Sequence, residues 1–294
     1  MYVITGASGN TGHVLATRLL EVGQKVRVVG RSRERLQGFA DKNAEVAVAD
    51  LRDEGAVTTA FSDATAVFVM IPPSMTSLNY RAEQDQTSDV FAKAIRKTGV
   101  PNVVSLSSVG ADKPGGTGPV AGLHYLEERL NEIADLNALH LRPAYFMENT
   151  LSQVTPIRMM GVTAGPIRAD LRIPMIATRD IGIAAADALL KLDFRGKQTE
   201  ELHGERDVSY NEVTAIIGKA IGKPELAYKE LSSSEFQAAL EQMGVSANVA
   251  GLIAELGEAV NSGHVRMLEP RSASTSTSTS YEAFVAEVFV PAFG

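Results

Sequence analysis

A glycine stands at every third position from residue 6 to residue 12, and short polar side chains occupy three of the positions between. This turn comprises Gly6, Ser8, Gly9, Asn10, Thr11 and Gly12. Glycine permits a positive φ and a close approach of the backbone to a pyrophosphate, while a helix that begins here offers unpaired N–H groups to the phosphates. Such a turn between a strand and a helix is typical of dinucleotide sites. We therefore expect these six residues to bind a nicotinamide dinucleotide.

Arginines follow the second predicted strand, at the position where the residue type usually distinguishes an NAD site from an NADP site. An NAD site usually has Asp or Glu here, roughly twenty residues past the glycines, to hold the ribose 2′-hydroxyl. This chain has Arg31 instead, with Ser32 beside it and Arg35 one turn later. A guanidinium pairs with a 2′-phosphate through two charge-assisted hydrogen bonds. The arginines also fit a solvated helix turn capped by Ser32, and both interpretations can hold together. We expect NADP(H), with NAD(H) as the alternative.

Polar side chains also follow two later β-rich runs. Asp50 ends the run at residues 45–49, where it either faces the adenine or caps the helix near residues 54–61. Ser107 and Ser108 end the run at residues 102–106. They are placed to bind the ribose or a substrate carbonyl oxygen, or else to close the turn with side-chain hydrogen bonds.

The elements that would position these residues alternate regularly between strand and helix. The sequence predicts strands at residues 2–4, 26–29, 45–49, 66–71, 102–106 and 138–141, with amphipathic helices between them and a glycine- and proline-rich loop at 110–122. Alternation over roughly 140 residues is the signature of a doubly wound parallel sheet, the Rossmann α/β fold.

The pattern loosens in the second half of the chain. It predicts helices after Thr178 and Ser209, a short strand at 201–203, and two helices within 232–262. A serine- and threonine-rich run at 271–280 predicts a flexible or extended link before a last amphipathic helix that docks on the body. We expect a dinucleotide-binding domain at 1–150 and a smaller, mostly helical substrate-binding part at 151–294, with segments that contribute to the first.

Composition narrows the classes of partner. The net charge of −7 and the lack of a Lys/Arg block argue against nucleic-acid binding through phosphate neutralisation. No apolar run approaches the length of a membrane span, the N-terminus is already a strand, and the chain has no cysteine. Five scattered histidines offer no metal-ligand spacing. We expect a cytoplasmic protein without a metal, either a monomer or a homodimer.

Several motifs together resemble the atypical short-chain dehydrogenase/reductases of the NmrA-like branch. They are TGASGNTG from Thr5, GRSRERL from Gly30, AD at Asp50, SLSSVGAD from Ser105, HYLEERL from His124, LRPAYFMEN from Leu141, ATRDIG from Ala177 and the serine/threonine run. That group includes quinone, azo-dye and triarylmethane-dye reductases, ketoreductases of polyketide tailoring, and regulators that bind the nucleotide without turning it over. The resemblance covers nearly the whole chain.

The resemblance implies further cofactor contacts beyond the glycine turn, Arg31 and Arg35. They are Asp50, Leu51, Met70, Ile71, Pro72, Ser107, Pro143, Ala144, Tyr145 and Phe146. Substrate would lie between the nicotinamide and the second half of the chain, against Ser108, Phe146, Met147 and Asn149. Plain core packing is the alternative for the last three, more so for Phe146 than for Asn149.

The catalytic residues that the resemblance implies are incomplete. The typical family site pairs a serine with Tyr-x-x-x-Lys, whereas this chain has Tyr125 followed by Arg129, and a planar guanidinium is not equivalent to an ammonium. Tyr125 is either the proton donor or an ordinary helix residue. His124 is the other candidate, since dye- and quinone-reductase relatives often carry a histidine here, and it equally fits a solvent-facing position. With Ser107, these are the candidate catalytic residues.

An incomplete triad is compatible with reduction because hydride transfer is the cofactor's chemistry and the protein mainly aligns the reactants. A conjugated acceptor can spread the developing negative charge itself. We therefore expect an NADPH-dependent reductase that acts on a carbonyl or quinone carbon of an aromatic small molecule. The alternative is a non-catalytic protein that senses NAD(P)(H).

Overall fold

The computed structural model describes residues 1–294, and its first half alternates strand and helix as the sequence predicts. The elements are β1 (Tyr2–Thr5), α1 (Asn10–Glu21), β2 (Val26–Gly30), α2 (Arg33–Ala40), β3 (Glu45–Val48), α3 (Glu54–Phe61), β4 (Ala66–Val69), α4 (Tyr80–Thr98), β5 (Asn102–Leu106), η1 (Gly118–Val120), α5 (Ala121–Asn131) and β6 (Asn137–Pro143). No helix of the chain has both the length and the apolar character that crossing a bilayer requires.

The central sheet has seven parallel strands in the order β10-β6-β5-β4-β1-β2-β3. Strand order reverses between β1 and β4, which is where an open α/β sheet leaves a crevice at the carboxyl ends of its strands. The predicted Rossmann α/β fold is therefore confirmed.

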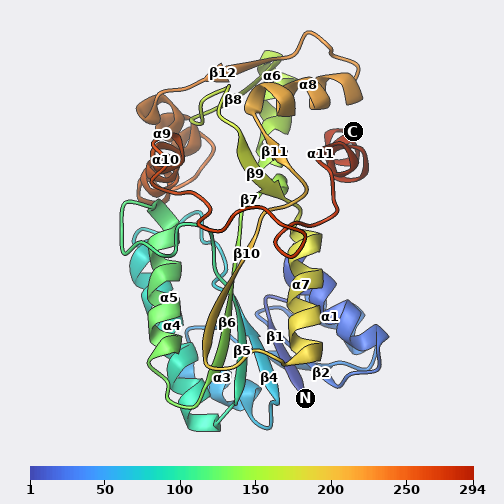
Figure 1. The fold of residues 1–294 in the computed structure, drawn as a ribbon, viewed down its shortest axis with the longest axis vertical. Coiled ribbons are helices and arrows are strands. Elements are labelled where there is room, and N and C mark those ends of the chain that lie inside the picture. The colour runs from blue at the N-terminus through green and yellow to red at the C-terminus, as the bar shows by residue number, and fades with distance from the viewer.

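Two helical layers cover the sheet (Figure 1). Side chains of α1, α2 and α7 (Thr178–Lys191) share one apolar core with alternate strand residues such as Ile4, while those of α3, α4 and α5 share the other core with residues such as Val3. Successive strand residues point to opposite faces, so a strand buried on both sides must be apolar throughout. The all-buried AVFV of β4 is such a strand.

The second half of the chain returns to this sheet before it leaves again. Helix α7 packs on α1, where a Cβ on Gly182 would lie 2.7 Å from the Thr11 carbonyl oxygen. Strand β10 (Lys197–Leu202) then pairs in parallel with Ala138–Pro143 of β6. The strand expected at 201–203 is thus longer, begins earlier and is the edge strand of the main sheet. The boundary at residue 150 stays a prediction.

We call residues 144–177 and 203–294 the second lobe, which forms the upper part of Figure 1. It contains β7 (Tyr145–Phe146), η2 (Met147–Gln153), α6 (Val154–Met160), β8 (Val162–Gly165), β9 (Ile173–Ile176), β11 (Asp207–Val208), α8 (Tyr210–Ala220), β12 (Ala227–Glu230), α9 (Ser233–Gln242), α10 (Ala247–Asn261), α11 (Tyr281–Phe284), a π-helical turn (Val285–Phe289) and α12 (Val290–Phe293). The small sheets β11-β9-β7 and β12-β8 were not expected from the sequence.

The C-terminal segment docks on the second lobe, as predicted. Tyr281, Phe284 and Phe289 are buried in the core of that lobe. The serine/threonine run before this segment packs on the rest of the protein. The hydroxyl of Thr279 donates to Asp180 of α7 at 2.7 Å, and Thr275 is buried.

Candidate active site

The glycine turn between β1 and α1 leaves no room for a Cβ at Gly6 or Gly12. Gly6 has a φ of +68°, and a Cβ there would lie 2.7 Å from the sulfur of Met70. A Cβ on Gly12 would lie 2.3 Å from the Gly6 carbonyl oxygen, because the first turn of α1 rests on the end of β1. The N–H of Gly9 donates to that same carbonyl at 2.9 Å. The turn is therefore a compact cradle at the amino end of α1, as an anion site requires.

The polar residues of the turn differ in exposure. Asn10 is exposed and Ser8 is partly exposed, so both can reach a ligand. Thr11 is buried, and its hydroxyl donates to the Thr178 carbonyl at 3.5 Å. The expected side-chain donor at Thr11 therefore faces α7 instead.

Thr5 joins the two strands at which the strand order reverses. Its hydroxyl donates to the Phe68 carbonyl and accepts from the N–H of Met70, both at 3.1 Å. The side chain of Met70 lies on Gly6, and Ile71 and Pro72 continue this rim, both partly exposed. Sequence reasoning missed Thr5, although its place directly before the glycine turn was a usable signal.

Three charged residues follow the carboxyl ends of β2 and β3, where the sequence predicts the adenosine part of the cofactor. Arg31 and Arg35 are exposed, and the Arg35 guanidinium donates to the Ser8 carbonyl at 3.2 Å. Asp50 pairs with Arg52 at 3.1 Å, and hydrogen bonds from Arg52 lower the pKa of that carboxyl, with a smaller contribution from Arg31. Helix α3 is capped by Asp53, so the capping interpretation of Asp50 is wrong. The neighbouring Leu51 is buried in the sheet core.

At the end of β5, Ser107 belongs to a buried polar cluster. The residue is 2% exposed, and its hydroxyl donates to Glu127 of α5 at 2.5 Å. The same carboxylate accepts from Arg142 of β6 at 2.9 Å and 2.5 Å, and that hydrogen bonding raises the pKa of Arg142. The proton of Ser107 is thus already donated within the protein. Sequence reasoning missed Glu127 and Arg142, which come from separate elements.

The remaining catalytic candidates point in different directions. A ring nitrogen of His124 lies 2.8 Å from the Ala111 carbonyl of the loop after β5, so His124 borders that loop. The hydroxyl of Tyr125 donates instead to Asp89 of α4 at 3.1 Å, and burial followed by this hydrogen bond raises the pKa of Tyr125. No hydrogen bond joins Ser107, His124 and Tyr125. Their catalytic roles stay predictions. Ser108 is partly exposed and donates to the Val109 carbonyl.

The segment after β6 crosses from the sheet into the second lobe. The Pro143 carbonyl accepts from Val109, and Ala144 donates to the Leu202 carbonyl at 2.9 Å, so neighbouring chain segments on both sides hold it. Phe146 packs on the sheet core that also touches Met70.

The next residues of this segment differ in how far their side chains are buried. Met147 is buried in the second-lobe core and Ala144 is buried too, so the expected ligand contacts of their side chains have no open surface in this structure. Asn149 is exposed and Tyr145 partly exposed, so both can face a ligand. Between them, Glu148 accepts from the N–H of Thr178 at 3.0 Å, which ties the segment to α7.

The second lobe contacts the loops that follow β4 and β5. Ser246 donates its N–H to the Met75 carbonyl at 2.9 Å, and Asn248 of α10 accepts from the N–H of Tyr80 at 2.8 Å. His264 lies 3.2 Å from the Gly115 carbonyl of the loop after β5. The predicted loop at 110–122 therefore runs beneath α10, and its last residues already belong to η1 and α5.

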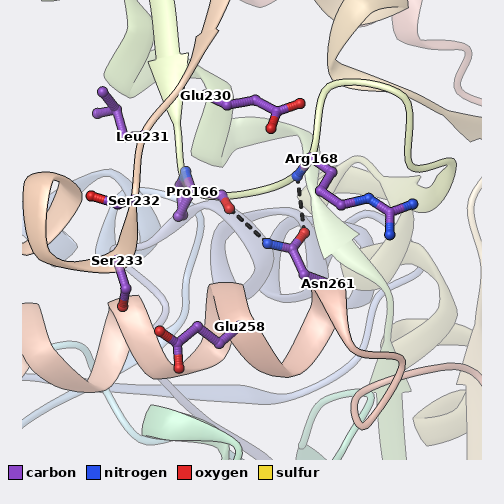
Figure 2. Close-up of a pocket in the computed structure, with 8 residues that line it drawn as sticks. All are labelled: Pro166, Arg168, Glu230, Leu231, Ser232, Ser233, Glu258 and Asn261. Carbon is purple, nitrogen blue, oxygen red and sulfur yellow. Dashed lines mark hydrogen bonds between the residues drawn. The ribbon is translucent and has the colours of Figure 1, made fainter.

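A separate hollow of about 370 Å³ lies within the second lobe (Figure 2). It is lined by Pro166, Arg168, Glu230, Leu231, Ser232, Ser233, Glu258 and Asn261. The Asn261 amide donates to the Pro166 carbonyl and accepts from the N–H of Arg168, so its polar groups already serve the local backbone. None of the predicted site residues lines this hollow.

Comparisons with known proteins agree with this geometry. The sequence profile of the NmrA-like family matches residues 2–284. Quinone oxidoreductase 2 of Escherichia coli (strain K12) is 28% identical over 261 residues, which cover 87% of this chain and 86% of that protein.

Solved structures show the same fold. The NADPH-dependent quinone oxidoreductase of Escherichia coli, complexed with NADPH, has a TM-score of 0.83 at 22% identity, covering 98% of this chain and 100% of that one. Triphenylmethane reductase of Citrobacter sp., complexed with NADP(H), has 0.78 at 18%, covering 97% and 99%. NmrA, a negative transcriptional regulator in complex with NAD, has 0.76 at 14%, covering 99% and 95%. The fold, the glycine turn and the family match lead to one conclusion: this chain belongs to the NmrA-like family.

Proposed function

We propose that this protein is an NADPH-dependent oxidoreductase that transfers hydride to a carbonyl or quinone carbon of an aromatic small molecule. The observation that carries the proposal is the cradle at residues 6–12, where backbone fills the space that a Cβ on Gly12 would need. Two exposed arginines, Arg31 and Arg35, stand beside it. A cationic rim suits the 2′-phosphate that distinguishes NADPH from NADH.

The residues divide the binding of the cofactor between them. The turn from Gly6 to Gly12 binds the pyrophosphate through backbone N–H groups, and Arg31 and Arg35 bind the 2′-phosphate. Asp50 faces the adenosine. The rim at Met70–Pro72 and the segment Pro143–Phe146 border the nicotinamide half, on the other side of the point where strand order reverses.

When bound, the nicotinamide supplies the hydride. The chain's own task is then to hold the acceptor at the right distance and to exclude water. The segment with Phe146 and Asn149 contacts the substrate from the second lobe, and Ser108 and His124 contact it from the β5 side. The named activities of the relatives support this: one is a quinone oxidoreductase, and a structural neighbour is a triphenylmethane reductase.

Oxidation of NADPH and NADH at 340 nm, against quinones, azo dyes and aromatic ketones, tests the proposal. We expect turnover with a preference for NADPH. Tight NADPH binding without turnover of any acceptor would contradict it.

A second function, nucleotide sensing without catalysis, has one observation in its favour. The hydroxyls of Ser107 and Tyr125 already donate within the protein, to Glu127 and Asp89 respectively. The neighbour NmrA is a regulator solved with NAD. Nucleotide binding without turnover is the outcome that favours this function.

A further inference from the structure

The hydroxyl of Tyr145 accepts a hydrogen bond but donates none within the protein. Tyr210 of α8 donates its hydroxyl to the Tyr145 oxygen at 3.2 Å. Burial raises the pKa of Tyr145, and the hydrogen bond from Tyr210 opposes that rise, as expected for a donor to the phenol oxygen. No hydrogen bond runs from the Tyr145 hydroxyl to any other group.

The other candidate hydroxyls differ in this respect. Ser107 donates to Glu127, Ser108 donates to the Val109 carbonyl, and Tyr125 donates to Asp89. Each would have to break a hydrogen bond within the protein before it could donate to a substrate. Tyr145 would not.

Tyr145 also stands where the two lobes meet. It follows the carboxyl end of β6 by two residues, and β7 pairs with β9 so that Tyr145 lies opposite Met175. Its ring packs on the second-lobe core, whereas its neighbour Phe146 packs on the sheet core beside Met70, the residue that covers Gly6. The residue remains partly exposed. Tyr145 therefore lies where the segment after β6 passes from the sheet core to the second-lobe core, and its hydroxyl meets Tyr210 there.

We propose that Tyr145 is the proton donor of the reduction, with Tyr210 as the residue that positions it. This inference rests on the proposed function. Hydride adds to the acceptor carbon and the π bond to oxygen breaks. The oxygen then takes the Tyr145 proton to give the alcohol, and NADPH leaves as NADP⁺. For a quinone the first product is a hydroxycyclohexadienone, which becomes the hydroquinone when its carbon-bound proton is lost to water and water protonates the second oxygen. Tyr145 is left as a phenolate, which water reprotonates after the product departs.

The hydrogen bond from Tyr210 to the phenol oxygen of Tyr145 favours this step because it stabilises the negative charge that forms on that oxygen. Such preorganised donors act where charge develops and need no reorganisation during the reaction. Tyr210 is buried, so its hydroxyl keeps a fixed direction. Tyr210 thus stabilises the phenolate of Tyr145, as a cation beside a catalytic tyrosine would otherwise do.

The test compares three tyrosine-to-phenylalanine variants with the unsubstituted protein. Each is assayed for kcat and KM with the acceptor that the unsubstituted protein reduces fastest, and for NADPH affinity by fluorescence titration. Tyr281→Phe is the matched control, because it removes a buried hydroxyl of the same core that donates to Thr150 at 2.9 Å rather than to Tyr145.

We expect Tyr145→Phe to lower kcat by about 100-fold or more, the usual contribution of a general acid, with NADPH affinity unchanged. Tyr210→Phe lowers kcat by about tenfold at constant KM, since it removes the hydrogen-bond donor to the developing charge. Tyr281→Phe keeps kcat within about twofold, since no proton transfer passes through it.

A Tyr145→Phe variant that binds NADPH and retains kcat within about threefold overturns the inference but leaves the reductase in place. If Tyr145→Phe fails to fold, Tyr210→Phe decides, since it retains Tyr145: an unchanged kcat overturns the inference. Absence of turnover by the unsubstituted protein overturns the proposed function and the proton donor with it.

Discussion

Replacement of Gly12 by alanine should disable the proposed cofactor site by moving α1, the helix that we propose binds the phosphates. The added Cβ would lie 2.3 Å from the Gly6 carbonyl oxygen, 2.7 Å from its carbon and 3.0 Å from the Ala7 Cα. All three are backbone atoms, so no side chain can rotate away. The amino end of α1 must therefore retreat by about 1 Å to reach ordinary contact distance, and this is overpacking of a tightly packed site.

The size of the effect follows from two opposing contributions. Overpacking against rigid backbone costs about 3 kcal/mol, and alanine in place of glycine within a helix returns about 1 kcal/mol. The free energy of unfolding should therefore fall by about 2 kcal/mol. Loss of two N–H bonds to a phosphate, at about 1.5 kcal/mol each, weakens NADPH binding by about 100-fold.

Gly38→Ala is the matched control, because Gly38 lies in α2 without a positive φ, and a Cβ added there would have no other atom within 4 Å. It should raise stability by about 1 kcal/mol and leave NADPH binding unchanged. Urea unfolding and NADPH fluorescence titration measure both quantities. A Gly12→Ala protein with parental stability and parental affinity would refute the close-packing argument.

Three further substitutions test other parts of the site and its support. Arg31→Ala should raise the KM for NADPH by about tenfold and leave the KM for NADH unchanged. Its control is Arg33→Ala, the substitution of an exposed neighbour, which should change neither KM. Equal effects of Arg31→Ala on both cofactors would contradict a 2′-phosphate role. Glu127→Ala leaves the largely buried guanidinium of Arg142 without its partner and should lower the free energy of unfolding in urea by about 3–5 kcal/mol. Asp187→Ala breaks the half-exposed pair with Arg18 and should lower it by at most about 1 kcal/mol. Similar losses from both substitutions would show that burial of the pair does not matter here. Burial lowers the pKa of His140 to about 4, below its usual 6.5, so the folded state binds fewer protons than the unfolded chain. Stability from this group is complete above pH 6.5 and is lost as the pH falls toward 4, by roughly 3 kcal/mol in all. Unfolding of His140→Gln between pH 7 and pH 4 should show a weaker pH dependence than the parent, and an identical slope would remove this residue as the cause.

Much of the fold follows from local sequence patterns. The strand, glycine turn and helix at residues 2–21 are readable because apolar spacing and glycine placement act within one or two turns of the chain. The same holds for the alternation through β6, which limits the choice to a parallel sheet with two helical layers.

The second lobe was harder to predict because its strands are short and pair over long distances. Strand β12 pairs with β8 some sixty residues earlier, and neither has a periodic pattern that separates it from a loop. The extension of β10 was missed because KQTE at its start is polar and largely exposed, as an edge strand allows.

For the glycine turn, the sequence alone predicted a tight connection between β1 and α1, since Gly6, Gly9 and Gly12 contact one another within a single turn. Only the tertiary structure decided which hydroxyls already have acceptors. Ser107 meets Glu127 across twenty residues, and Tyr210 meets Tyr145 across 65. Motif spacing says nothing about such partners, because they depend on which elements the folded core brings into contact. The proposed proton donor therefore depends on the packed fold, whereas the proposed phosphate site depends on the local chain.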